Sequence, residues 1–130
     1  MKSVTFTCSV PPGVNELYAN RKVIRVGKSR QFGRAMTPKY AAWRKEAMQM
    51  LMIQRVRPII GRVDIDVYID EASTSDARDI DSCLKAPIDA LVAFGIIEDD
   101  SKRYVRRTQS QWDNVPEGCR IVITEVETIS

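Results

Sequence analysis

The sequence contains no histidine among its 130 residues. This absence excludes histidine-based catalytic triads, histidine general bases and the commonest side-chain ligand of transition metals. The glycine-rich patterns GxxxxGK[ST] and GxGxxG are also missing, so the phosphate-binding loops that they build are excluded and no nucleotide cofactor is expected. Any catalysis must therefore rest on carboxylates, on lysine or on a bound metal ion.

Cysteine is scarce, and long apolar runs are absent. The three cysteines, Cys8, Cys83 and Cys119, are widely separated and fit no zinc spacing, which favours a reducing compartment and makes the cytoplasm the expected location. No apolar run approaches the ~18–20 residues of a membrane span, and the N-terminal MKSVTFTCSV alternates instead of forming a signal-peptide core. We expect a single domain over residues 1–130 that does not enter a membrane.

Acidic residues are scarce in the first half of the chain. Residues 1–62 contain 13 Lys/Arg and only two acids, Glu16 and Glu46, a charge of +11. Residues 63–130 contain 7 Lys/Arg and 15 acids, a charge of −8, and the two halves together give the net +3. The basic half suggests a polyanionic partner bound in a salt-sensitive way. The acidic half suggests bound cations or charge pairing between the halves.

Hydrophobic periodicity predicts a small α/β (α+β) domain in which a mixed four-stranded sheet packs with two main helices. Thr37-Pro38 is a typical helix start, and Gly95 is expected to cap the second helix. The elements are expected in the order β-α-β-α-β-β, at residues 3–10, 37–54, 62–70, 80–95, 103–112 and 119–127.

Two segments leave alternatives open. Residues 17–36 carry no acid. Within them, KVIRV and the following GKS could form an irregular hairpin, and otherwise the segment is a mobile basic loop. The run AMQMLMI in the first helix could complete the core or form a subunit interface, and core packing is favoured because methionine is a common filler. In the strand RVDIDVYID, the alternating Asp64, Asp66 and Asp70 are expected on an exposed face in preference to a metal site.

The stretch RDIDSCLKAPID and the later EDD bring several charges together. Asp79 and Asp81 can converge only if a helix begins near them, because residues two apart diverge on a helix and share a side in extended chain. In a continuous helix Asp81 would meet Lys85, while Pro87 would kink that helix at a cost of about 3 kcal/mol. If the chain reverses after Gly95, Asp100 would approach the helix start and complete a carboxylate site suited to Mg²⁺.

These acids have an ordinary structural interpretation as well. Asp79 would cap the helix, Asp81 and Lys85 would form a surface ion pair worth less than ~1 kcal/mol, and EDD would be a polar turn. The basic half favours the functional interpretation, because a nuclease needs carboxylates for metal and a basic surface for phosphates.

Several motifs together resemble the RusA-type Holliday-junction resolvases of bacterial and phage genomes. The resemblance spans nearly the whole chain. It rests on PPGVNELY, TPKYAAWR, RDID, LKA, DAL, GIIEDD and CRIVITEVE, in this order. The sequence departs from the family pattern at Ser82, which stands in place of an asparagine, at Pro87, and in a longer basic insert over residues 22–34.

The resemblance implies a homodimeric, Mg²⁺-dependent endonuclease, with Mn²⁺ as a possible substitute, that cuts four-way DNA junctions. The family's catalytic and metal-binding acids fall on Asp79, Asp81 and Asp100, and its catalytic lysine falls on Lys85. Asn15 and Arg78 match further motif positions and are expected to contact DNA. Backbone phosphates are expected to be contacted by Arg21, Arg25, Arg30, Arg34, Lys102, Arg103, Arg106 and Arg107. The alternatives are a non-catalytic binder of branched DNA and a metal nuclease that acts on other branched DNA.

Overall fold

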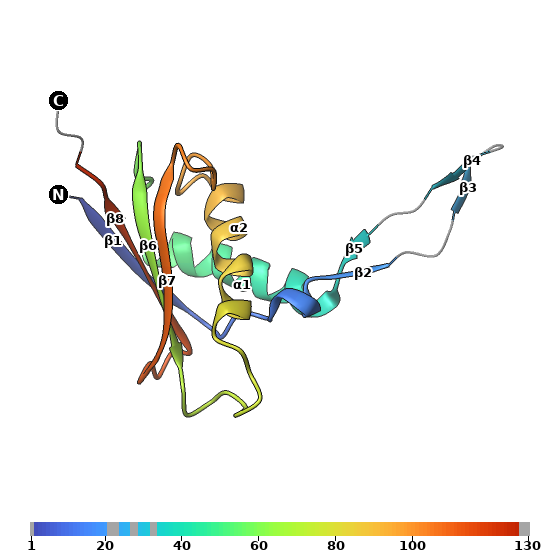
Figure 1. Cartoon of the computed structure of the whole chain (residues 1–130), viewed down its shortest axis with the longest axis horizontal. Coiled ribbons are helices and arrows are strands. Elements are labelled where there is room, and N and C mark those ends of the chain that lie inside the picture. Colours follow the sequence, from blue (N-terminus) through green and yellow to red (C-terminus); the bar gives the residue numbers. More distant parts are fainter. Residues whose placement is uncertain (1, 21–23, 27–28, 32–33, 128–130) are drawn as a thin grey trace.

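A mixed four-stranded sheet forms the body of the protein (Figure 1). The computed structural model describes residues 2–20, 24–26, 29–31 and 34–127, and it describes side chains outside residues 20–34. The sheet has the order β1-β8-β6-β7, in which β6 and β7 are parallel and the other neighbours antiparallel. Its strands are β1 (Ser3–Cys8), β6 (Val63–Asp70), β7 (Val105–Asp113) and β8 (Cys119–Glu125). The predicted fold class and element order are confirmed.

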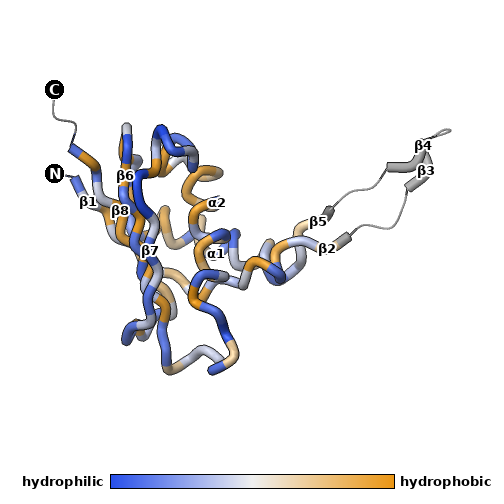
Figure 2. Tube along the Cα trace, in the orientation of Figure 1, coloured by the Kyte–Doolittle hydropathy of each residue, from blue (hydrophilic) through white to orange (hydrophobic). Residues whose placement is uncertain are grey.

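Two helices, α1 (Pro38–Ile53) and α2 (Lys85–Ala93), cover one face of this sheet (Figure 1). Figure 2 shows that α2 is largely hydrophobic along its length. The core between helices and sheet includes Ile65 and Ile121 from the central strands, and Leu91 from α2. Within the part of the chain that the structure describes, no helix has the length and apolar character needed to cross a membrane.

Helix α1 begins as its sequence predicts. The Thr37 hydroxyl accepts a hydrogen bond from the Tyr40 amide at 3.2 Å, and Pro38 occupies the first helical position. The expected core packing of the methionine-rich run is only partly right. Ala47 and Leu51 are buried and Met50 packs against the core, but Met52 and Ile53 are exposed. The run therefore has one side on the core and another side exposed to solvent.

The second predicted helix begins later than its sequence pattern suggests. A single 3-10 turn, η2 (Asp81–Cys83), precedes α2, which starts at Lys85. Pro87 therefore lies in the first turn of α2, where a backbone N–H has no partner inside the helix, so the missing N–H costs no helical hydrogen bond. The expectation that Pro87 kinks the helix is wrong for this reason.

Gly95 ends α2 as predicted. Its φ of 73° lies in the left-handed region, which glycine adopts without steric cost. The Ile96 amide donates to the Leu91 carbonyl at 2.9 Å and the Gly95 amide donates to the Val92 carbonyl at 3.1 Å. This paired arrangement satisfies carbonyls that would otherwise lack partners at the helix end.

The aspartates of β6 do not all lie on an exposed face, which corrects the prediction for Asp64 and Asp70. Both residues are buried, with exposed fractions of 6% and 7%. A register shift between Val63 and Asp64 places two β7 residues, Arg106 and Arg107, near one residue of β6. Such a bulge re-aims side chains, and here it lays two arginines over Asp64.

The basic segment forms a hairpin-like arm. Its strands are β2 (Tyr18–Asn20), β3 (Ile24–Val26), β4 (Ser29–Gln31) and β5 (Arg34–Met36). Strand β2 pairs with β5 and β3 pairs with β4, both antiparallel, and β3 and β4 lie far from the sheet (Figure 1). Of the two expectations for residues 17–36, the structure supports the irregular hairpin.

Candidate active site

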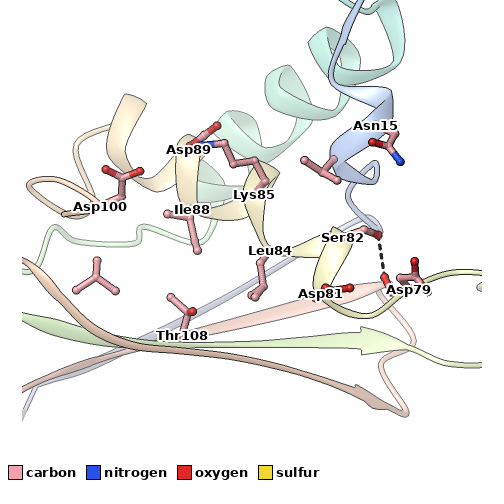
Figure 3. Close-up of a pocket in the computed structure, with 12 residues that line it drawn as sticks. Asn15, Asp79, Asp81, Ser82, Leu84, Lys85, Ile88, Asp89, Asp100 and Thr108 are labelled. Atoms are coloured by element: carbon pink, nitrogen blue, oxygen red, sulfur yellow. Dashed lines mark hydrogen bonds and ion pairs between the residues drawn. The ribbon is translucent and has the colours of Figure 1, made fainter. Parts of the chain in front are cut away.

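An open pocket of about 470 Å³ lies between the start of α2, the 3-10 turn η1 (Val14–Glu16) and β7. Its floor is apolar, formed by side chains such as Leu84, Ile88 and Val105. Its polar side chains are Asn15, Asp79, Asp81, Ser82, Lys85, Asp89, Asp100 and Thr108 (Figure 3). All four predicted catalytic residues therefore line one pocket, although they are spread over positions 79 to 100 of the chain.

Asp79 and Asp81 lie at one end of this pocket, on the turn that leads into η2 (Figure 3). The two carboxylates can converge only if a helix begins near them, and helical structure does begin at Asp81. The Ser82 hydroxyl donates to the Asp79 carbonyl at 2.8 Å and closes the turn. Both aspartates are exposed, so their carboxylates face solvent and are open to a ligand.

Lys85 pairs with Asp89 across a distance of 3.4 Å between Nζ and Oδ1. The expected meeting of Asp81 and Lys85 on one helix face does not occur, because α2 starts at Lys85 and Asp81 belongs to a separate 3-10 turn. Asp89 is the residue one helical turn beyond Lys85. The ammonium group is thus held at the pocket by a carboxylate that the sequence interpretation did not include in the site.

Asp100 lies at the Ile88–Asp89 end of the pocket, away from Asp79 and Asp81 (Figure 3). The chain does reverse after Gly95, as expected, but it brings Asp100 beside the middle of α2 instead of its start. In the described ranges, no three acid or cysteine side chains gather closely enough to hold a metal ion. The three carboxylates share a pocket without meeting, and metal binding remains a prediction.

Arg78 is turned inward, toward the protein. Its Nη2 donates to the Pro11 carbonyl, and its Nη1 lies 3.4 Å from the Glu16 carboxylate. The side chain is only 20% exposed, so these contacts occupy much of the guanidinium that was expected to contact DNA. Glu16 was missed by the sequence interpretation, although it is one of only two acids in the first 62 residues. That scarcity is the signal that could have identified it.

The other predicted DNA contacts have different surroundings. Arg106 donates to both oxygens of Asp64, at 3.1 and 2.6 Å, so its charge is largely offset. Lys102 and Arg103 are exposed and line a shallow surface with Arg62. The side chains of Arg25, Arg30 and Arg34 lie outside the described ones, and Arg21 lies outside the described residues altogether.

No protein-family model matches the chain, and no curated protein matches it.

Proposed function

We propose that this protein is a Mg²⁺-dependent endodeoxyribonuclease that resolves four-way DNA junctions in recombination and repair. The main support for this proposal is the open pocket that is lined by Asp79, Asp81, Lys85 and Asp100. A chain without histidine has few other ways to hydrolyse a phosphodiester, and a pocket of exposed carboxylates beside an ammonium group has the required chemistry.

The side chains of the pocket fit Mg²⁺ or Mn²⁺ in their chemistry. Carboxylate oxygens are the ligands that these hard cations prefer. Asp79 and Asp81 at one end of the pocket, and Asp100 at the other, are the residues that would hold one or two such ions. A bound Mg²⁺ would lower the pKa of water and stabilise charge on the phosphate. Lys85, oriented by Asp89, would neutralise negative charge that develops on the scissile phosphate.

Basic residues on two sides of the pocket would hold the DNA. Lys102 follows Asp100 closely and is exposed next to Arg62 and Arg103. The arm adds further cations that would follow backbone phosphates, which positions DNA without reading its bases. Since a junction must be cut at two related positions, a twofold-symmetric homodimer would supply the two sites.

We place the protein in the cytoplasm, where DNA junctions of bacterial or phage origin would arise. The three cysteines are free, and all three are buried. Free thiols that are not joined in disulfides fit a reducing compartment.

Replacing Asp81 with Asn tests the proposal. The amide keeps the size of the side chain but removes the charge that would hold the ion. We expect cleavage of a labelled four-way junction in Mg²⁺ to fall about 100-fold or more, while junction binding without metal is unchanged or tighter. Asp76→Asn, which alters an exposed acid outside the pocket, is the matched control and should cleave normally.

Three outcomes would contradict the proposal or redirect it. Binding of the junction by the wild type without any cleavage would identify a non-catalytic binder of branched DNA. Faster cleavage of flaps or other branched substrates in a panel would identify a different metal nuclease. Loss of both binding and folding in Asp81→Asn would assign Asp81 a structural role.

A further inference from the structure

We propose that Glu16 is a positioning residue, which acts through Arg78 to fix the turn that carries Asp79 and Asp81 and couples this turn to the base of the basic arm. The inference rests on the proposed nuclease function and extends it to a residue outside the pocket. Three sets of contacts support it. The first joins Glu16 to Arg78, the second lies between the turns η1 and η2, and the third joins Glu16 to the arm.

The first set joins Glu16 to the residue before Asp79. The Arg78 guanidinium contacts the Glu16 carboxylate and the Pro11 carbonyl, while the Arg78 amide donates to the Ser75 carbonyl at 3.0 Å. Its Nε is buried and has no hydrogen-bond partner among the described residues. A largely buried cation depends strongly on the carboxylate that offsets its charge. Glu16 is that carboxylate, so its removal should loosen Arg78 and the turn that follows.

The second set is a close approach between the turns η1 and η2. A Cβ placed on Gly13 would lie 3.2 Å from the Ser82 hydroxyl and 3.6 Å from the Arg78 Nη2. Ser82 in turn bonds to the carbonyl of Asp79. The Gly13 amide donates to the Glu16 carboxylate at 3.2 Å, so Glu16 also holds the segment against which the Asp79 turn packs.

The third set joins Glu16 to the arm. The arm leaves the body after Leu17 and returns at Thr37, where the Thr37 amide donates to the Leu17 carbonyl at 3.0 Å. The Thr37 hydroxyl donates to the Glu16 carbonyl at 2.6 Å, and the Lys39 ammonium pairs with the Glu16 carboxylate. The hydrogen bond from Lys39, followed by that from the Gly13 amide, lowers the pKa of Glu16 and keeps it ionised. The arm therefore contacts Glu16 at its main-chain carbonyl through Thr37 and at its carboxylate through Lys39, and the carboxylate is the group that also contacts Arg78.

The ordinary alternative is that Glu16 is only a surface acid within a basic region. The two interpretations predict different rates of the chemical step for Glu16→Gln. Loss of a negative charge from a basic surface should strengthen DNA binding and leave the chemical step alone. Loss of a positioning contact should in addition slow the chemical step, because small displacements of catalytic groups are costly.

The experiment compares Glu16→Gln with Glu46→Gln, the other acid of the basic half, whose carboxylate accepts from the Ser9 amide and hydroxyl. Single-turnover cleavage at saturating protein and junction affinity without metal are measured for each, with thermal unfolding as the test of folding. We expect the Glu16→Gln cleavage rate to fall about 10-fold, with an affinity equal to or higher than that of the wild type. Glu46→Gln should cleave like the wild type.

A double-mutant cycle tests the route through Arg78. If Glu16 acts through Arg78, Glu16→Gln should have little further effect on the rate in an Arg78→Gln background. Arg78→Lys keeps the charge but cannot make the forked contact with Pro11 and Glu16, so it should cleave as slowly as Glu16→Gln. This variant tests the same contact if Glu16→Gln does not fold.

The outcomes separate this inference from the function on which it rests. A wild type that cuts no DNA overturns the proposed function and the inference with it. A wild type that cuts normally, beside a Glu16→Gln variant with a normal rate, overturns the inference alone. Additive effects of the two substitutions, or a rate loss that follows weaker binding, also overturn it.

Discussion

At the scale of single residues, several charged side chains that were expected at the surface pair with groups of the protein itself. Asp64 is buried beneath Arg106 and Arg107, and Arg78 faces Glu16 and Pro11. Buried charges of this kind depend on their partners, because an unpaired charge is costly away from water. Removing one charge of such a pair should therefore destabilise the fold more than removing a charge that is exposed to solvent.

The pair of Asp64 and Arg106 should make stability depend on pH. The hydrogen bonds from Arg106 lower the pKa of Asp64 below its ordinary value. Because the folded pKa is depressed, the pair stabilises the protein above the unfolded-state pKa of about 3.9 and loses this effect as the pH falls through the folded pKa. We expect Arg106→Gln to be less stable than wild type at pH 7, with a difference that narrows as the pH decreases below about 4.

Urea unfolding from pH 7 to pH 3 measures this difference. Arg103→Gln removes a positive charge just before β7 and is the control for a simple change in net charge. An Arg106→Gln deficit that stays constant over the whole range would show that Asp64 does not titrate in the way we infer.

At the scale of elements, the entry into α2 determines where the catalytic candidates lie. A 3-10 turn at Asp81–Cys83 followed by an α-helix from Lys85 separates Asp81 from the face of the helix. It also moves Pro87 into the first helical turn, where proline is tolerated. The break between the two elements thus explains both the altered pairing of Lys85 and the tolerance of Pro87.

Replacing Pro87 with Ala tests this placement. A proline that kinked the helix would destabilise it, and its removal would increase stability by about 3 kcal/mol. Because Pro87 is instead buried in the first turn, we expect a loss of about 1–2 kcal/mol from reduced apolar burial and greater freedom of the unfolded chain. Ala90→Pro, one turn further, should cost at least about 3 kcal/mol. Chemical denaturation measures both, and a more stable Pro87→Ala would contradict the assignment.

At the scale of the whole molecule, the described ion pairs leave the basic half with most of its excess positive charge. Among the described ion pairs, Arg106 with Asp64 and Lys85 with Asp89 lie within the acidic half, and Lys39 with Glu16 lies within the basic one. Arg78 with Glu16 joins the two halves. The arm belongs to the basic half and has no acid between residues 17 and 36, which suits it to a polyanion.

Removal of the arm should separate folding from DNA binding. Asn20 and Arg34 are directly opposed in the pairing of β2 with β5, so an Asn-Gly turn in place of residues 21–33 can join them. We expect the unfolding temperature to change by less than about 4 °C. Junction affinity should fall, and the salt dependence of log K should decrease by about 0.9 for each phosphate that the shortened protein no longer neutralises.

A full-length variant that replaces Arg21, Lys22, Arg25, Lys28 and Arg30 with Gln is the matched control for the shape of the arm. It should show the same decrease in salt dependence while retaining the arm's length. An unchanged salt dependence in both variants would exclude the arm from phosphate binding.

Local sequence features determined most of the fold by themselves. The alternation of Ile65 and its neighbours specified a strand, Thr37-Pro38 specified a helix start, and Gly95 specified a helix end. Each of these depends on interactions within a few residues, such as a capping hydroxyl or a left-handed backbone. The spacing of Asp79 and Asp81 set only a condition, that a helix must begin near them if their carboxylates are to converge, and helical structure does begin at Asp81.

Tertiary structure alone decided what these elements bring together. The bulge that lays Arg106 over Asp64 and the contact of Glu16 with Arg78 join residues far apart in sequence. The path of the chain after α2 places Asp100 in the same pocket as Asp79 and Asp81. No local pattern encodes such contacts, because strand register and the path of the chain after a helix depend on how the whole core packs. The sequence determined which residues can carry the chemistry, and the packing of the sheet against its two helices decided which of them share a pocket.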